Sequence, residues 1–290
     1  MKVLITGING FIGKNLALSL ENRYEIIGLS RDSVGKKKIQ IIKHDITNKN
    51  FPDMEVDAIF HMAALTDLDF CTKNPKMAYE VNVKGTENVL EFAKETGVKK
   101  MVYASTGGVY GSHKKELIES MKPAPENEYS ATKYKGELLC KKYSRFLSIS
   151  VLRYFFPYGP FSDKKRLMPG LFDNINMGHP VMVSKCGGPM LNPIYISDAV
   201  SGTKKALEKA TGFEVFNMAG KEVVSIMELA EKIGTISGKN VIFKFRENGK
   251  EVNFIGNMEK AKKILGYIPK VKLDEGLKKY AKHRCTNARP

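Results

Sequence analysis

A short apolar run at the N-terminus leads directly into three glycines at a fixed spacing. The run is Lys2–Thr6, and a helical pattern begins near Phe11. The first glycine permits a tight turn, the second lets the backbone approach a pyrophosphate, and the third lets a helix pack closely on the strand. The N-terminus of that helix offers free N–H groups to phosphate. We therefore expect a bound dinucleotide here. The candidate cofactor residues of this loop are Gly7, Asn9, Gly10, Phe11, Ile12 and Gly13.

Short apolar runs alternate with longer amphipathic segments over the first two-thirds of the chain, which predicts βαβ units on a parallel sheet. We expect an α/β fold, with a Rossmann-type doubly wound parallel sheet in residues 1–160. Residues 161–290 are expected to form mainly a smaller α/β substrate lobe, from which segments near 190–210 return to the first domain. The expected strands are Lys2–Thr6, Tyr24–Leu29, Ala58–His61, Lys100–Ala104 and Ser148–Leu152, and the expected helices begin near Phe11, Ala78, Tyr129 and, after a capping box at Ser225-Ile-Met-Glu228, Ile226.

The residues after the second predicted strand bear on the choice of cofactor. An acidic residue there would accept hydrogen bonds from the ribose of NAD, whereas an arginine would pair with the 2′-phosphate of NADP. Ser30 and Arg31 stand at this point, with Lys36–Lys38 close behind. Asp32 is one or two positions late for the acidic role. The pattern favours NADP and leaves NAD possible.

A tyrosine and a lysine four residues apart begin the helix predicted near Tyr129. Side chains at the spacing of Tyr129 and Lys133 share one face of a helix. A nearby ammonium is expected to lower a tyrosine pKa from about 10, so that the phenol can exchange a proton with a hydroxyl while hydride moves. Tyr110 and Lys114 have the same spacing, but a strand-and-turn pattern follows Tyr110, so no helix is expected to align them.

Composition limits the classes of ligand and partner that we expect for this chain. The net charge is +16, which suits either nucleic acid or an anionic small molecule. Clusters such as Lys164-Lys165-Arg166 are not interleaved with aromatic residues, so we expect the small molecule and no nucleic acid. Four separated cysteines with no CxxC pair predict no metal site. No apolar run approaches the length of a membrane span or a signal peptide, so we expect a cytoplasmic protein that does not bind membranes.

Several further motifs occur in order along the whole chain, and with them the sequence resembles the extended short-chain dehydrogenase/reductases of the NAD-dependent epimerase/dehydratase group. The motifs are Gly7-x-x-Gly10-x-x-Gly13, His61-Met-Ala63-Ala64, Asn82-x-x-Gly85-Thr86, Ser105-Thr106-Gly-Gly-Val109-Tyr110-Gly111, Tyr129-x-x-x-Lys133 and Arg153-Tyr-Phe-Phe-Pro-Tyr-Gly159-Pro160.

The resemblance implies roles for matching positions. Tyr129, Lys133 and Thr106 would be catalytic, with Thr106 bonded to the substrate oxygen and Lys133 also holding the nicotinamide ribose. It further implies cofactor contacts from Ser30, Arg31, Asp45, Ile46, Ala63, Ala64 and Phe156, and substrate contacts from Thr66, Thr106, Phe156 and Asn192. A homodimer formed through the helices Ala78–Thr96 and Tyr129–Phe146 is also implied, and the apolar pattern of the first helix extends beyond one face.

The chain also departs from the family pattern. Gly107-Gly108 replaces the Asp-Glu pair with which family dehydratases eliminate water, so a 4,6-dehydratase is not expected. Phe156 and Leu191 stand where sugar-nucleotide epimerases usually carry Asn and Arg. Our leading hypothesis is an NADP-preferring reductase of a nucleotide-linked 4-keto sugar. The alternatives are a nucleotide-sugar epimerase with tightly bound NAD and, from another class, a non-catalytic dinucleotide-sensing or RNA-binding protein.

Overall fold

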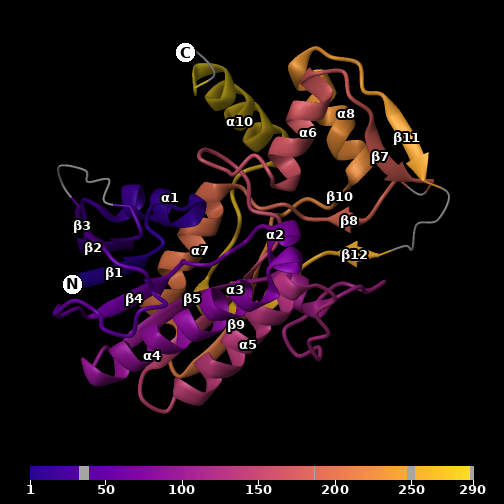
Figure 1. The fold of residues 1–290 in the computed structure, drawn as a ribbon. Helices are drawn as coiled ribbons and strands as arrows, with labels where there is room; N and C mark the ends of the chain where they lie inside the picture. The colour runs from indigo at the N-terminus through magenta and orange to yellow at the C-terminus, as the bar shows by residue number, and fades with distance from the viewer. Residues whose placement is uncertain (33–38, 186, 247–251, 288–290) are drawn as a thin grey trace.

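The computed structural model describes residues 1–32, 39–185, 187–246 and 252–287. Within these residues, parallel strands form a seven-stranded sheet in the order β3-β2-β1-β4-β5-β6-β9 (Figure 1). The order reverses between β1 and β4, and open α/β sheets bind ligands at the carboxyl ends of strands at such a point. This topology confirms the predicted doubly wound fold. The strands are β1 (Lys2–Thr6), β2 (Glu25–Ser30), β3 (Gln40–Lys43), β4 (Ala58–His61), β5 (Lys100–Thr106), β6 (Ser148–Tyr154) and β9 (Phe213–Met218).

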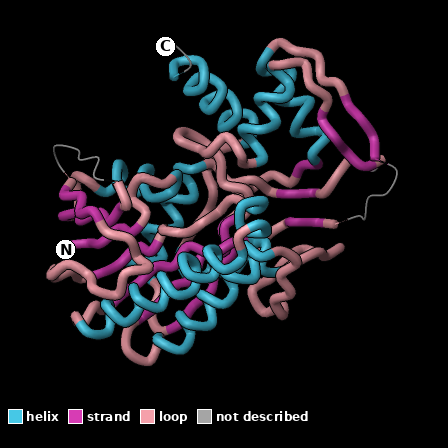
Figure 2. Tube along the Cα trace, in the orientation of Figure 1, coloured by secondary structure: helices cyan, strands magenta, loops and turns pink. Residues whose placement is uncertain are grey.

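Helices cover both faces of this sheet, with an apolar core under each layer (Figure 2). Successive side chains of a strand point to opposite faces. Val3 and Ile5 therefore join the core that contains α1 and α7, whereas Leu4 joins the core that contains α4 and α5. Burial on both faces explains why these strands read as continuous apolar runs. The helices of the two layers are α1 (Phe11–Leu20), α2 (Leu68–Lys73), α3 (Pro75–Tyr79), α4 (Gly85–Glu95), α5 (Glu128–Tyr143) and α7 (Ile196–Lys209).

The helix predicted near Ala78 begins earlier and contains an irregular turn. It starts at Pro75, passes through a π-helical turn at Glu80–Lys84, and continues as α4. Asn82, within this turn, accepts a hydrogen bond from the Leu65 amide (2.8 Å) and donates to Leu65 O and Thr132 Oγ1 (3.0 Å each). The turn thereby ties the loop after β4 to α5, which carries the candidate catalytic pair.

Smaller elements form a second lobe above the carboxyl ends of the sheet strands (Figure 1). The predicted capping box is confirmed, because Ser225 Oγ accepts from Glu228 N (3.1 Å) while Glu228 Oε2 accepts from Ser225 N (2.8 Å). The chain leaves this lobe after β8, and α7 and β9 rejoin the main sheet. The lobe comprises α6 (Leu167–Asn176), β7 (Val181–Ser184), β8 (Met190–Leu191), β10 (Val224–Ser225), α8 (Ile226–Ser237), β11 (Phe243–Arg246), β12 (Asn253–Phe254) and α10 (Leu273–Asn287), whereas α9 (Glu259–Leu265) packs on α7 and β9 of the main sheet.

Candidate active site

The glycine loop between β1 and α1 has a shape that side chains would fill. Gly7 has a φ of +65°, and its carbonyl accepts a hydrogen bond from Gly10 N (2.9 Å). A Cβ atom on Gly13 would lie 2.3 Å from Gly7 O, and one on Gly7 would lie 2.7 Å from the Ala63 Cα. The start of α1 is thus held against the ends of β1 and β4. Asn9 and Gly10 are exposed, so the loop can accept the pyrophosphate of a dinucleotide.

The end of β2 lies beside this loop. Asn9 Nδ2 donates to Ser30 Oγ (2.9 Å), which also accepts from Asp32 N (3.2 Å). Arg31 is exposed next to this contact. Lys36–Lys38, which contributed to the predicted preference for NADP, lie outside the described residues.

Asp45 and Ile46, for which the family resemblance implies cofactor contacts, follow β3. One carboxylate oxygen of Asp45 accepts from both the amide and the hydroxyl of Thr47 (2.9 Å each), which stabilises the turn. Ile46 is buried, and its side chain fills the space that a Cβ atom on Gly85 would need. Both side chains therefore have contacts within the protein, and Ala64, after β4, is half-buried.

The three candidate catalytic residues come from the end of β5 and the start of α5. Asn127 caps this helix by accepting from Ser130 N (2.9 Å). Thr106, the last residue of β5, hydrogen-bonds to Tyr129 and accepts from Gly108 N (3.1 Å). Lys133 is only 2% exposed, and its Nζ lies 4.1 Å from the centroid of the Tyr103 ring. The predicted spacing on one helix thus brings Tyr129 and Lys133 beside Thr106.

The sequence predicted that the ammonium of Lys133 lowers the pKa of Tyr129, but the structure shows a different balance of effects. Burial raises the pKa of Tyr129 above 10, while the guanidinium of Arg166 and the bond with Thr106 act in the opposite direction. Burial also lowers the pKa of Lys133 to about 7. The prediction that Lys133 lowers the pKa of Tyr129 is therefore wrong for this structure, because burial weakens the charge of the lysine and the opposing cation comes from another segment.

The competing pair at Tyr110 is separated as expected. A 3₁₀ helix (Gly107–Tyr110, η2) ends at Tyr110, so no helix aligns this residue with Lys114. The Tyr110 hydroxyl is buried and donates to Asn217 Oδ1 (2.8 Å). Tyr110 therefore has a packing role in the described fold.

The candidate substrate residues Thr66, Phe156 and Asn192 differ in their exposure and in their contacts. Thr66 is exposed beside Asp67, the N-cap of α2. Phe156 has a φ of +44°, and its ring meets Phe254 edge-on, with the centroids 6.0 Å apart. Asn192 is buried, with Nδ2 donating to Gly256 O and Oδ1 accepting from Gly256 N (3.0 Å each). The amide of Asn192 thus bonds two parts of the protein together, and this geometry gives no support to the predicted substrate contact.

Arg166 is a site residue that the sequence analysis did not single out. It caps α6, and its guanidinium carbon lies 5.4 Å from the centroid of the Phe11 ring in the glycine loop. Its Nε is buried and has no hydrogen-bond partner among the described residues. The sequence showed only a basic cluster at this point, and no local pattern reveals that the loop after β6 folds toward α1 and α5.

Comparisons with known proteins agree with this geometry. The model of the "NAD dependent epimerase/dehydratase family" matches residues 3–219. The chain is 31% identical to a UDP-glucuronate 4-epimerase of Thermodesulfobacterium geofontis, covering 95% of this chain and 94% of the relative. It is 30% identical to UDP-glucuronic acid decarboxylase 6 of Arabidopsis thaliana, covering 96% and 87% of the two chains.

A solved structure extends the likeness to three dimensions. The UDP-glucuronic acid 4-epimerase of Bacillus cereus, in complex with UDP-glucuronic acid and NAD, superposes with a TM-score of 0.88 at 28% identity. The match covers 99% of this chain and 100% of the other. Among the described residues, no helix is both long and apolar enough to cross a membrane. The chain therefore belongs to the NAD-dependent epimerase/dehydratase family and is an enzyme of the short-chain dehydrogenase/reductase type.

Proposed function

We propose that this enzyme is a 4-epimerase of UDP-linked sugars that uses NAD. The observation that carries the proposal is the pairing of Thr106 with Tyr129 at the carboxyl end of β5, on the same edge of the sheet as the glycine loop after β1. Relatives named as UDP-sugar 4-epimerases, and the B. cereus enzyme solved with NAD, support the choice of reaction and cofactor. The proposal replaces a reductase as our leading hypothesis.

The side chains divide the work of the reaction. In its phenolate form Tyr129 takes the proton of the sugar hydroxyl, and as the phenol it later returns that proton, while Thr106 holds the same oxygen by a hydrogen bond. When it is charged, Lys133 would stabilise the phenolate form of Tyr129, and it would hold the nicotinamide ribose. The glycine loop and Lys133 would hold NAD, which would supply the hydride acceptor and donor for oxidation and re-reduction of the sugar carbon.

Two glycines support epimerisation over elimination. A Cβ atom on Gly107 would lie 2.6 Å from Phe155 Cε1, and one on Gly108 would lie 2.5 Å from Ser130 Oγ. An acid and a base could not occupy these positions unless the surrounding residues moved. A 4,6-dehydratase, which needs both groups, therefore does not fit the space around Thr106.

Arg166 supports an anionic substrate. Its buried Nε lacks a partner among the described residues, and its guanidinium lies between the glycine loop and the vicinity of Tyr129. We propose that it pairs with the diphosphate or with a sugar carboxylate of the substrate. Thr66 and Phe156 remain candidates for further substrate contacts.

The proposed function is tested by incubating the purified enzyme with UDP-glucose or UDP-glucuronic acid and following the sugar by proton NMR. We expect the C4 epimer to form from at least one substrate without net consumption of added NAD or NADPH. A decarboxylase would instead release CO2 from UDP-glucuronic acid. Loss of NADPH in step with reduction of a 4-keto sugar, and no epimer from either UDP-sugar, would restore the reductase hypothesis.

We also propose that the enzyme is a homodimer. The apolar positions of α4, such as Val89 and Leu90, are buried within the chain, so they no longer argue for a partner. Met77 on α3 and Leu138 on α5 are 52% and 49% exposed, and they present apolar surface near the expected helices. Light scattering at micromolar concentration should give the mass of a dimer, and a uniform monomer would contradict the proposal.

A further inference from the structure

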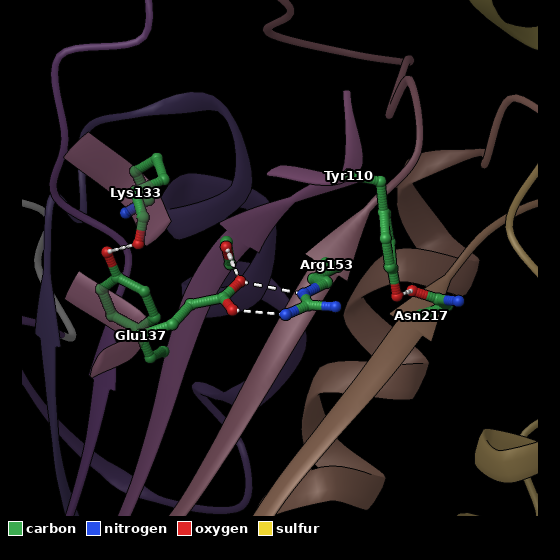
Figure 3. A network of polar contacts seen from close by, with 7 residues as sticks. Tyr110, Lys133, Glu137, Arg153 and Asn217 are labelled. Carbon is green, nitrogen blue, oxygen red and sulfur yellow. Dashed lines mark hydrogen bonds and ion pairs between the residues drawn. The ribbon is translucent and has the colours of Figure 1, made fainter. Parts of the chain in front are cut away.

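A buried ion pair lies beneath the candidate catalytic residues. Arg153 donates to both carboxylate oxygens of Glu137, from Nη2 (2.6 Å) and Nε (3.0 Å), and Ser105 Oγ donates to Glu137 Oε1 (2.5 Å). The side chains of the ion pair are each 4% exposed. Figure 3 shows Glu137 between Lys133 on one side and Arg153 on the other.

Each member of this group adjoins a candidate catalytic residue. Glu137 is four residues after Lys133 on α5, so the two side chains share a face of the helix. Ser105 immediately precedes Thr106 at the end of β5. The carboxylate of Glu137 therefore links the helix that carries Lys133 to the strand that carries Thr106.

The other side of the Arg153 guanidinium packs against Tyr110, and its Nη1 has no hydrogen-bond partner among the described residues. Its guanidinium carbon lies 4.6 Å from the centroid of the Tyr110 ring, and Tyr110 is bonded to Asn217 on β9 (Figure 3). Asn217 Nδ2 in turn donates to Leu117 O (2.8 Å) and Asn257 O (3.1 Å). The ion pair is thus fixed between α5 and the segments that lead to the second lobe.

The other titratable groups around Lys133 carry no negative charge at neutral pH. Burial raises the pKa of the Tyr103 and Cys140 side chains and that of Tyr129, so all three are protonated. Burial and the charge of Lys133 lower the pKa of His61 to about 3, so its ring is neutral. Among the described residues that face Lys133, the charged ones are Glu137 and, behind it, Arg153.

A role in stability alone does not account for this arrangement. Removing two charges from water is costly, and a buried ion pair is often no more stable than apolar side chains of the same volume. Burial acts against the ammonium of Lys133, whereas Cys140 and Glu137 act in its favour, and of these two only Glu137 offers a negative charge at neutral pH, because the Cys140 thiol is protonated.

We propose that Glu137 is a positioning residue that keeps the ammonium of Lys133 charged and in place behind Tyr129, with Arg153 and Ser105 holding the carboxylate. The proposal rests on the functions proposed above for Tyr129 and Lys133. Glu137 itself touches neither substrate nor cofactor in this scheme, and it acts through the lysine.

The test is the pH profile of turnover for Glu137→Gln, which keeps the shape of the side chain and removes its charge. Without the carboxylate, Lys133 loses its proton at lower pH, so we expect the alkaline limb of the profile to move down by about one pH unit. Turnover above the limb should then fall about tenfold more than turnover at pH 6. Asp173→Asn, which neutralises a carboxylate paired with Arg284 in the second lobe, should leave the limb unmoved.

Glu137→Gln leaves Arg153 buried without its partner and can therefore unfold the protein. The double variant Glu137→Gln/Arg153→Met removes both charges, and its alkaline limb should move in the same direction. NAD affinity measured against pH by calorimetry gives a second readout that needs no substrate, and its midpoint should move with that of Lys133. A folded variant whose midpoint matches the parent in this titration would overturn the proposal, even if the parent fails to epimerise any UDP-sugar.

Discussion

The two halves of the molecule hold their polar groups in different ways. In the dinucleotide half, buried polar side chains bond to neighbouring elements of one sheet, as where His61 lies between the hydroxyls of Thr6 (2.7 Å) and Thr86 (3.0 Å). In the second lobe, strands of two residues pair in a small sheet, and the side chain of Asn192, just after β8, bonds to Gly256, just after β12. The first arrangement gives the proposed cofactor site a rigid frame, whereas the second lobe depends on a few short strands and individual side-chain bonds.

This difference predicts where single substitutions act on chemistry and where they act on folding. Substitutions in the frame at the ends of β5 and α5 should change turnover while the fold persists. Substitutions at side chains that bond two segments of the second lobe together, such as Asn192, should lower stability before they affect turnover.

The largest effect is expected for Tyr129→Phe. The change removes the exchangeable proton and keeps the ring, so turnover should fall by about 10²–10⁴ while the fold and NAD binding remain. Steady-state kinetics with the UDP-sugar and circular dichroism measure the two quantities. Tyr134→Phe, five residues further along the same helix, is the matched control and should stay within a few-fold of the parent. Normal turnover in Tyr129→Phe would transfer the acid–base role to another group.

The second effect concerns acid stability of the dinucleotide half. The pKa of His61 is about 3 in the folded protein, whereas an unfolded histidine has a pKa near 6.5. The unfolded state therefore takes up a proton that the folded state refuses, and stability is lost as the pH falls from about 6.5 toward 3. The loss amounts to a few kcal/mol in the free energy of unfolding, at most about 5.

His61→Gln, which can bond to the same two hydroxyls, isolates this contribution. The variant should be less stable than the parent at pH 7.5, and the gap should narrow by a few kcal/mol on going to pH 4. Urea unfolding at a series of pH values measures the gap. A gap that stays constant with pH would show that His61 is not the group that titrates.

Local patterns predicted most of the dinucleotide half, including the glycine loop and five of the seven sheet strands. The glycine loop, Tyr129 and Lys133 are each defined by spacing within one strand, turn or helix, and spacing is what a sequence displays. Strand β3 escaped prediction because it is a half-buried edge strand with no continuous apolar run. Strand β9 escaped because its first three residues are only partly buried and because it joins the sheet after a long excursion through the second lobe.

Properties that depend on three-dimensional neighbours could not be predicted in the same way. The position of Arg166 and the buried state of Lys133 both arise from contacts between elements far apart in the sequence. The pKa of Tyr129 was wrongly predicted for this reason, since the spacing revealed a nearby lysine but not the burial of both groups. Substrate contacts could not be predicted for the same reason. Asn192 was expected to contact the substrate, but its side chain bonds to Gly256 in a distant segment.

The third prediction concerns the hydrogen bonds of Asn192 with Gly256, which join two segments of the second lobe. Asn192→Ala leaves the amide and the carbonyl of Gly256 buried without their partner, which should lower the free energy of unfolding by about 1–3 kcal/mol. If Asn192 has only this structural role, KM for the UDP-sugar should change less than a few-fold. Thermal unfolding and steady-state kinetics separate the two roles. An unchanged melting temperature with a large rise in KM would instead identify Asn192 as the substrate residue that the family resemblance implied.

The smallest effect is expected for Arg31→Ala, at the edge of the dinucleotide half. Arg31 is exposed, so solvent screens any pairing with a 2′-phosphate, and its loss should weaken NADP binding by about 1 kcal/mol, or roughly fivefold. Binding of NAD, which lacks that phosphate, should be unchanged in the variant, and the parent should bind NAD at least as tightly as NADP. Calorimetric titration of both cofactors into both proteins measures this. A parent that clearly prefers NADP, with the preference erased in Arg31→Ala, would contradict the proposed cofactor and return the sequence-based hypothesis to first place. A rigid frame would then have been adapted to a second cofactor by one exposed side chain, because the backbone that holds the pyrophosphate is the same for both.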